Sequence, residues 1–126
     1  MKNAIIMKTF DIKDMKTNRT LEILKTYNSA QKNHWQLMCD LSDNDYDINY
    51  FGGRVTANDN FGNLLQDQED DDCFNIDELL NYLLNSYNEC IEEQNRYYDE
   101  YKCWNENYRG YINEIDLLMK IVQQQY

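Results

Sequence analysis

The sequence of 126 residues has no proline, only four glycines and a single histidine. Without proline, nothing imposes a rigid break on a helix once it has begun. No apolar run approaches the roughly 20 residues that a membrane-spanning helix needs, and Ala4-Ile5-Ile6-Met7 is too short for the apolar core of a signal peptide. We therefore expect one domain without a membrane anchor, located in the cytoplasm of the producing or infected cell.

Cysteine is too scattered to indicate a metal site or a disulfide framework. Cys39, Cys73, Cys90 and Cys103 show no CxxC spacing, which zinc sites and redox motifs use. Free thiols are typical of a reducing compartment. We expect neither a metal nor a cofactor.

The sequence also lacks the arrangements that catalysis requires, namely a nucleophile or base held by a partner group. The one histidine, His34, stands beside Trp35, where packing or surface exposure is the more common role. The short motifs of serine hydrolases, zinc peptidases, P-loops and dinucleotide-binding folds are absent. We predict that the protein is not an enzyme.

Two short stretches imitate binding loops and fail on inspection. Alternate aspartates over 43–47 have the spacing of an EF-hand opening, but Ile48 stands where the loop needs glycine and Arg54 where it needs glutamate. Phe51-Gly52-Gly53-Arg54 offers backbone amides and a cation to a phosphate, although a strand that ends in a turn explains the same residues. We assign no site to either stretch.

Basic residues are scarce and unevenly placed. The chain has 12 Lys and Arg against 23 Asp and Glu, a formal charge of −11. Residues 1–36 hold seven basic and three acidic residues, whereas residues 37–126 hold five and twenty. An acidic body repels nucleic acid and attracts basic surfaces, and acidity also keeps a small protein dissolved. We expect no direct binding to nucleic acid.

The longest regular pattern covers residues 75–126. Its apolar, aromatic and occasional polar members alternate by three and four, which is the a/d seam of a coiled coil. They are Leu80, Leu83, Tyr87, Cys90, Gln94, Tyr97, Tyr101, Trp104, Tyr108, Tyr111, Ile115, Leu118 and Val122. Asn75 can cap the first turn, with Glu78 completing a capping box.

Two arrangements of this stretch remain open. Gly110 could end one helix in the left-handed conformation, with Asn113 capping a second, which gives an antiparallel hairpin. Alternatively, one helix of ~75 Å continues through Gly110. We favour the hairpin because residues 112–122 are apolar nearly all round, as expected of a segment covered on several sides.

Residues 1–57 are predicted to be mostly β. Period-two alternation over 35–41 and 46–51, around turn residues 42–45, indicates a β-hairpin with Trp35, Leu37 and Ile48 inward.

Weaker strand signals flank this hairpin. Residues 4–12 fit a first strand and 54–57 a short returning one, whereas 19–27 fit either a strand or a short helix. Residues 58–74 read as an exposed acidic connection. The predicted fold is α+β: a small N-terminal antiparallel β-meander followed by a long C-terminal helical hairpin, or by one long coiled-coil-like helix.

Acidic residues off the seam form the candidate partner-binding surface. They are Asp67, Glu69, Asp70, Asp71, Asp72, Glu89, Glu92, Glu93, Asp99, Glu100 and Glu106. The helical acids are sparser than the phosphates of duplex DNA, at about one charge per 1.7 Å, so any mimicry of nucleic acid is partial. Our first hypothesis is a small acidic binding protein that occupies the basic, nucleic-acid-binding surface of a partner protein. Phage-encoded inhibitors of host defence nucleases, both anti-CRISPR and antirestriction proteins, are of this type.

Two alternatives belong to other classes. A homo-oligomer could hold a small anionic ligand such as a nucleotide between aromatic rings, with Arg54, Arg96 and Arg109 on its phosphates. A plain structural coiled-coil protein would explain the helices and leave the charge unexplained.

We also predict a homo-oligomer built on the polar and aromatic part of the seam. Buried phenols and amides need hydrogen-bond partners that a second subunit would supply. The predicted interface residues are Tyr87, Gln94, Tyr97, Tyr101, Trp104 and Tyr108.

Overall fold

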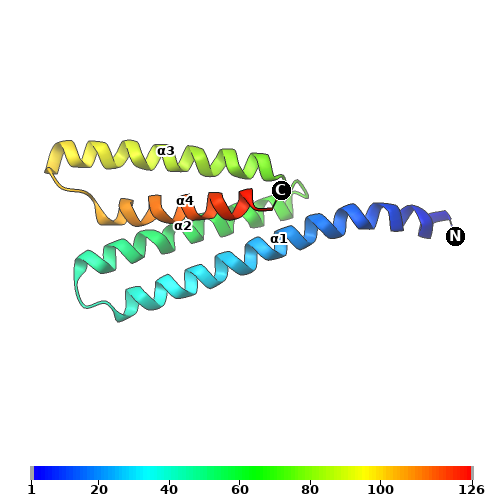
Figure 1. Cartoon of the computed structure of the whole chain (residues 1–126), viewed down its shortest axis with the longest axis horizontal. Helices are drawn as coiled ribbons and strands as arrows, with labels where there is room; N and C mark the ends of the chain where they lie inside the picture. The colour runs from blue at the N-terminus through cyan, green and yellow to red at the C-terminus, as the bar shows by residue number, and fades with distance from the viewer. Residues whose placement is uncertain (1, 126) are drawn as a thin grey trace.

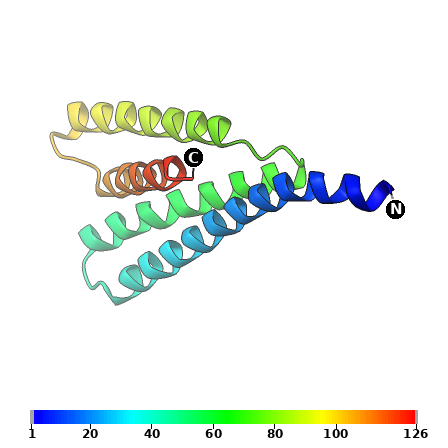
Figure 2. The same cartoon turned by 45° about the vertical axis from the view of Figure 1, so that its right-hand side comes forward.

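The computed structural model describes residues 2–125, with side chains from residue 17 onward, and within this range it contains four helices and no strand. Helix α1 spans Lys2–Leu41, α2 Asp45–Asp70, α3 Ile76–Tyr101 and α4 Glu106–Gln123. The chain forms two antiparallel hairpins, α1–α2 and α3–α4 (Figure 1). Helices α2 and α4 run parallel and pack together, while α1 and α3 lie on opposite sides of this pair (Figures 1 and 2).

The predicted β-meander is therefore wrong, and the fold is all-helical instead of α+β. Residues 4–12, 19–27 and 35–41 lie in α1, and 46–51 and 54–57 lie in α2. The expected acidic connection is mostly the second half of α2, which ends at Asp70. Leu37 and Ile48, predicted to point inward, are 54% and 36% exposed.

Polar and small residues in the buried stripes explain this error. Helix α2 buries Gly53, Ala57, Asn58, Phe61, Leu65 and Gln68, a helical period in which only half of the members are apolar. Helix α1 likewise buries Asn28 beside Leu21 and Leu24. Apolar periodicity does not identify buried asparagine, glutamine or glycine as core residues. The period-two alternation over 35–41 and 46–51 was therefore the stronger signal.

Helices α2 and α4 come close because a glycine stands on each at the crossing. A Cβ on Gly53 would lie 1.9 Å from the carbonyl oxygen of Asn107, and one on Gly110 would lie 2.0 Å from that of Tyr50. Both glycines are buried within their helices, and neither has a positive φ. The predicted helix end at Gly110 is wrong, since this glycine serves close packing.

The α3–α4 hairpin turns at residues 102–105. Lys102 takes the left-handed conformation with φ of 58°, and Asn105 caps α4 by accepting from the Tyr108 N–H at 3.0 Å. Of the two arrangements considered for residues 75–126, the structure has a hairpin with its turn before the predicted position. Asn113 is not a cap and lies inside α4.

The predicted cap of α3 is confirmed. The Asn75 side chain accepts the Glu78 N–H at 3.0 Å. The predicted capping box is wrong, because the Asn75 N–H donates to Gln68 Oε1 at 3.3 Å and not to the Glu78 side chain. Gln68 is buried at the end of α2, so the cap also joins α2 to α3.

All four helices contribute to one apolar core. Its buried members are Leu21, Leu24, Ala57, Phe61, Leu65, Leu79, Leu83, Ile115, Leu118 and Val122. Among the helices described, none carries an apolar stretch of the length needed to cross a bilayer.

Candidate functional site

The densest polar cluster lies inside the bundle, around Glu114 of α4. This carboxylate is fully buried. Its Oε1 accepts from Trp35 Nε1 at 3.1 Å, from Arg54 Nε at 3.0 Å and from Arg54 Nη2 at 2.8 Å. Its Oε2 accepts from Asn58 Nδ2 at 2.8 Å. One carboxylate thus joins α1, α2 and α4.

The groups around Glu114 are themselves held from several sides. The Arg54 guanidinium lies 4.0 Å from the centre of the Trp35 ring, and its Nη1 donates to the Tyr50 hydroxyl at 2.9 Å. Asn58 donates to Asn28 Oδ1 at 3.0 Å, and Asn28 Nδ2 returns a bond to the Asn58 carbonyl at 2.9 Å. The oxygen Asn58 Oδ1 has no hydrogen-bond partner among the described residues.

This cluster holds the helices in place and is closed to a substrate. Glu114 and Asn58 are 0% exposed. The donors that surround the carboxylate all form hydrogen bonds with acceptors of the protein itself. A buried ion pair contributes little net stability over an apolar pair but penalises arrangements that would leave it unpaired. Glu114 is not among the residues predicted from the sequence to be functional. The available signal was a charged residue on the apolar face that Ile115, Leu118 and Val122 define in α4.

The predicted acidic surface is exposed for the most part. Three of its members form ion pairs: Glu69 with Lys25, Glu93 with Arg96, and Glu106 with Arg109. The Glu106 side chain is only 10% exposed, so its assignment to the exposed acidic surface is wrong. The others are exposed, and no basic side chain of the described part of the chain pairs with them: Asp67, Asp70, Asp71, Asp72, Glu89, Glu92, Asp99 and Glu100.

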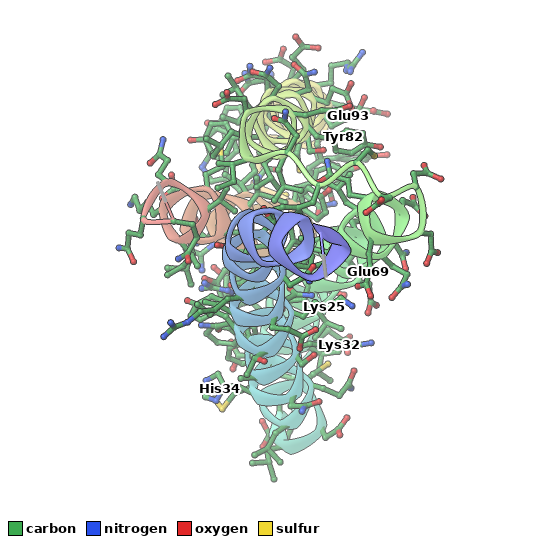
Figure 3. The ribbon with its side chains drawn as sticks, turned by 90° about the vertical axis from the view of Figure 1, so that its right-hand side faces the viewer. Lys25, Lys32, His34, Glu69, Tyr82 and Glu93 are labelled. Atoms are coloured by element: carbon green, nitrogen blue, oxygen red, sulfur yellow. The ribbon has the colours of Figure 1, made fainter. Side chains whose placement is uncertain are left out.

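A groove between α2 and α3, with α4 as its floor, brings part of this surface together. Two adjoining hollows of about 480 and 280 Å³ share Ser86, Glu89 and Tyr111. The remaining lining residues are Asn60, Asn63, Leu64, Asp67 and Tyr82 at one end, and Thr56, Cys90, Glu93, Asn107 and Tyr108 at the other. The lining contains three carboxylates and no lysine or arginine. Figure 3 shows Tyr82 and Glu93 on the same flank of α3.

The groove also contains a half-buried thiol. Burial, and then the nearby Glu93 carboxylate, raise the pKa of Cys90 to about 11. Its sulfur lies 3.7 Å from the Tyr108 carbonyl oxygen. Such a thiol is almost entirely protonated at neutral pH and is a poor nucleophile.

Several side chains predicted to form an oligomer interface make their contacts within one chain. Gln94, 7% exposed, accepts from the Asn105 N–H at 2.9 Å and donates to the Asn105 carbonyl at 3.0 Å. The Tyr97 ring contacts Tyr108 of α4 at a centroid distance of 6.2 Å. The premise that Gln94 needs a second subunit is therefore wrong, because the α3–α4 turn satisfies both of its polar atoms.

The other interface residues divide between the core and the surface. Tyr87 packs against the apolar core. Tyr101 and Trp104 are 56% and 51% exposed, and Trp104 stacks on Tyr98 at 4.4 Å. The oligomeric state stays a prediction.

The three arginines proposed for an anionic ligand are already paired with acids: Arg54 with Glu114, Arg96 with Glu93 and Arg109 with Glu106. Arg54 and Arg109 both lie over the Tyr50 ring, at 5.8 and 4.7 Å, whereas Arg96 stands on α3. This geometry gives the ligand alternative no support.

The aspartates that imitate an EF-hand have a local role. Asp45 and Asp47 lie in the first turn of α2, where negative charge favours the helix dipole. Asn44 caps this turn by accepting the Asp47 N–H at 2.9 Å. No three His, Cys, Asp or Glu side chains of residues 17–125 are placed to hold a metal ion.

Comparison of the chain with protein-family models, curated proteins and solved structures finds no match.

Proposed function

We propose that this is a small acidic, non-enzymatic binding protein that occupies a basic, nucleic-acid-binding surface of a partner protein. A nuclease complex of a host defence system has such a surface, so the proposed class is the phage-type inhibitor of host defence. The observation that carries the proposal is the uncompensated negative charge on the outside of α3 and on the turn before it.

In the part of the chain with described side chains, most Lys and Arg side chains pair with acids of the same chain. Six of the eight Lys and Arg side chains from residue 17 onward form ion pairs with acids of the same chain. The same part of the sequence has 21 acidic residues. The field outside the molecule is therefore negative, and such a field speeds the approach of a basic partner.

Helix α3 presents this charge in a fixed arrangement. It lies at the outer edge of the bundle (Figures 1 and 3). Four of its acids, Glu89, Glu92, Asp99 and Glu100, are exposed and form no ion pair within the described part of the chain, and they fall within ~16 Å of helix axis. Charges on a formed helix need no ordering on binding, which lowers the entropic cost of association. Duplex DNA carries about ten phosphates over that length, so charge and shape would drive recognition more than phosphate spacing.

The test compares two triple variants of equal net charge. In the first, Glu92→Lys, Asp99→Lys and Glu100→Lys reverse the outside of α3. In the control, Glu22→Lys, Asp40→Lys and Asp43→Lys reverse three exposed acids of α1 and its following turn.

Immobilised protein is then exposed to an extract of candidate host cells. We expect a nucleic-acid-binding protein to be retained by the wild type and the control and to be lost with the α3 variant. Added duplex DNA or RNA should release it, and its dissociation constant should rise steeply with salt. Retention by the α3 variant, or affinity that does not change with salt, would reject the proposal.

A further inference from the structure

The N-terminal part of α1 extends beyond the rest of the bundle. In Figures 1 and 2 the ribbon of α1 continues past the ends of α2 and α4, with no other helix beside it. The bundle ends near Thr17 and Thr20, which line a hollow with the start of α3 and with Gln125. Residues 2–16, which we name the arm, span ~22 Å as a helix.

The arm differs in charge from the rest of the chain. Its sequence has four lysines and two aspartates, a net charge of +2, while residues 17–126 have a net charge of −13. The arm is also rich in apolar residues: Ala4, Ile5, Ile6, Met7, Phe10, Ile12 and Met15. A single helix of this length is marginal in water without a surface to pack on.

The α2–α3 groove has the complementary properties. It is lined by Asp67, Glu89 and Glu93 without a basic residue, and it offers apolar contact through Leu64, Tyr82 and Tyr111. Tyr82 is 59% exposed, and the Tyr111 hydroxyl is held on the floor by Asn60 Nδ2 at 3.1 Å. The groove extends from Tyr82 to Glu93, ~16 Å along α3, which is three turns of an incoming helix.

We propose that the arm of one copy binds in the α2–α3 groove of a second copy. Lysines of the arm meet the groove carboxylates, and its apolar residues cover the tyrosine rings, which is the helix-in-groove mode of recognition. The arm extends past the end of its own bundle (Figures 1 and 2), so the occupied groove belongs to another chain. Reciprocal exchange between two copies closes a two-fold dimer. This dimer uses Glu89 and Glu93 of α3, which line the groove, but it does not use Glu92, Asp99 and Glu100, the acids that the test of the proposed function reverses.

A charge-swap experiment on the full-length protein tests the proposal. Wild-type protein at ~50 μM is expected to scatter light as a dimer, twice the 15.3 kDa of one chain. A groove variant, Asp67→Lys with Glu89→Lys, and an arm variant, Lys8→Glu with Lys13→Glu, should each raise the dimer dissociation constant at least tenfold. Circular dichroism of each variant establishes that it remains helical.

Mixing the two variants is the decisive step. The acidic arm of one should bind the basic groove of the other and restore a dimer. Glu92→Lys with Asp99→Lys, off the groove on the same helix, should leave the dimer unchanged. A monomeric wild type at this concentration would overturn the proposal, as would a dimer that either variant leaves intact or a mixture that stays monomeric. A monomer that still binds a basic partner through α3 would overturn this dimer and leave the proposed function standing.

Discussion

Removing the Glu114 carboxylate tests the role of the buried polar cluster most directly. In Glu114→Ala the Arg54 guanidinium, only 13% exposed, loses its counter-charge and two hydrogen bonds. Trp35 Nε1 and Asn58 Nδ2 lose their acceptor as well. Leaving a buried charge without its partner costs about 3–5 kcal/mol, a large share of the roughly 5–15 kcal/mol that stabilises a small domain.

Urea unfolding followed by circular dichroism measures this cost. With a denaturant slope of about 2 kcal/mol per molar, the midpoint should fall by roughly 1.5–2.5 M. The control is Asp116→Ala on the same helix, whose ion pair with Lys120 spans 3.0 Å between exposed groups. That change should cost no more than about 0.5 kcal/mol.

A double-mutant cycle separates the ion pair from the loss of packing. Arg54→Met should destabilise the wild type strongly but the Glu114→Ala protein much less, with a coupling free energy of about 2–3 kcal/mol. If Glu114→Ala costs less than about 1 kcal/mol, or if the two substitutions are additive, the cluster does not hold the helices as described.

Three further predictions concern packing and reactivity. Gly53→Ala should destabilise by about 1–3 kcal/mol in urea, because its Cβ would lie 1.9 Å from a carbonyl oxygen of α4. Gly52→Ala, with its nearest neighbour at 3.8 Å, should instead stabilise by about 0.5–1 kcal/mol; equal effects would contradict the close crossing. Cys90 should react with a thiol reagent far more slowly than the exposed Cys73, since only about a thousandth of a thiol with a pKa of about 11 is ionised at pH 8. Its rate should rise about tenfold per pH unit up to pH 10, and a flat profile would refute the burial. Leu37→Asp should cost less than about 1 kcal/mol of stability because this side chain is 54% exposed. A variant that unfolds would instead support the β-hairpin predicted from the sequence, in which Leu37 points inward.

The features that local sequence could predict are those with local causes. The cap of α3 forms because the Asn75 side chain reaches an N–H three residues ahead, an interaction that needs nothing from elsewhere. The exposure of Cys73 and the acidity of the surface likewise follow from composition. The acidic candidates Glu69 and Glu93 lie on the surface as predicted, whereas the Glu106 side chain is largely buried against its partner, and the basic partners of all three were not predicted. The Glu69 partner, Lys25, lies 44 residues away in the sequence.

The sequence by itself therefore determined the charge, the start of α3 and the apolar face on which Ile115, Leu118 and Val122 pack. Only the tertiary structure decided that residues 19–41 and 45–57 are helical and that Gly110 joins two helices instead of ending one. The physical reason is that buried Asn28, Asn58 and Glu114 are favourable only when their hydrogen-bond partners arrive from other helices. Similarly, a glycine that removes a clash at 2.0 Å cannot be told from one that ends a helix until the second helix is in place.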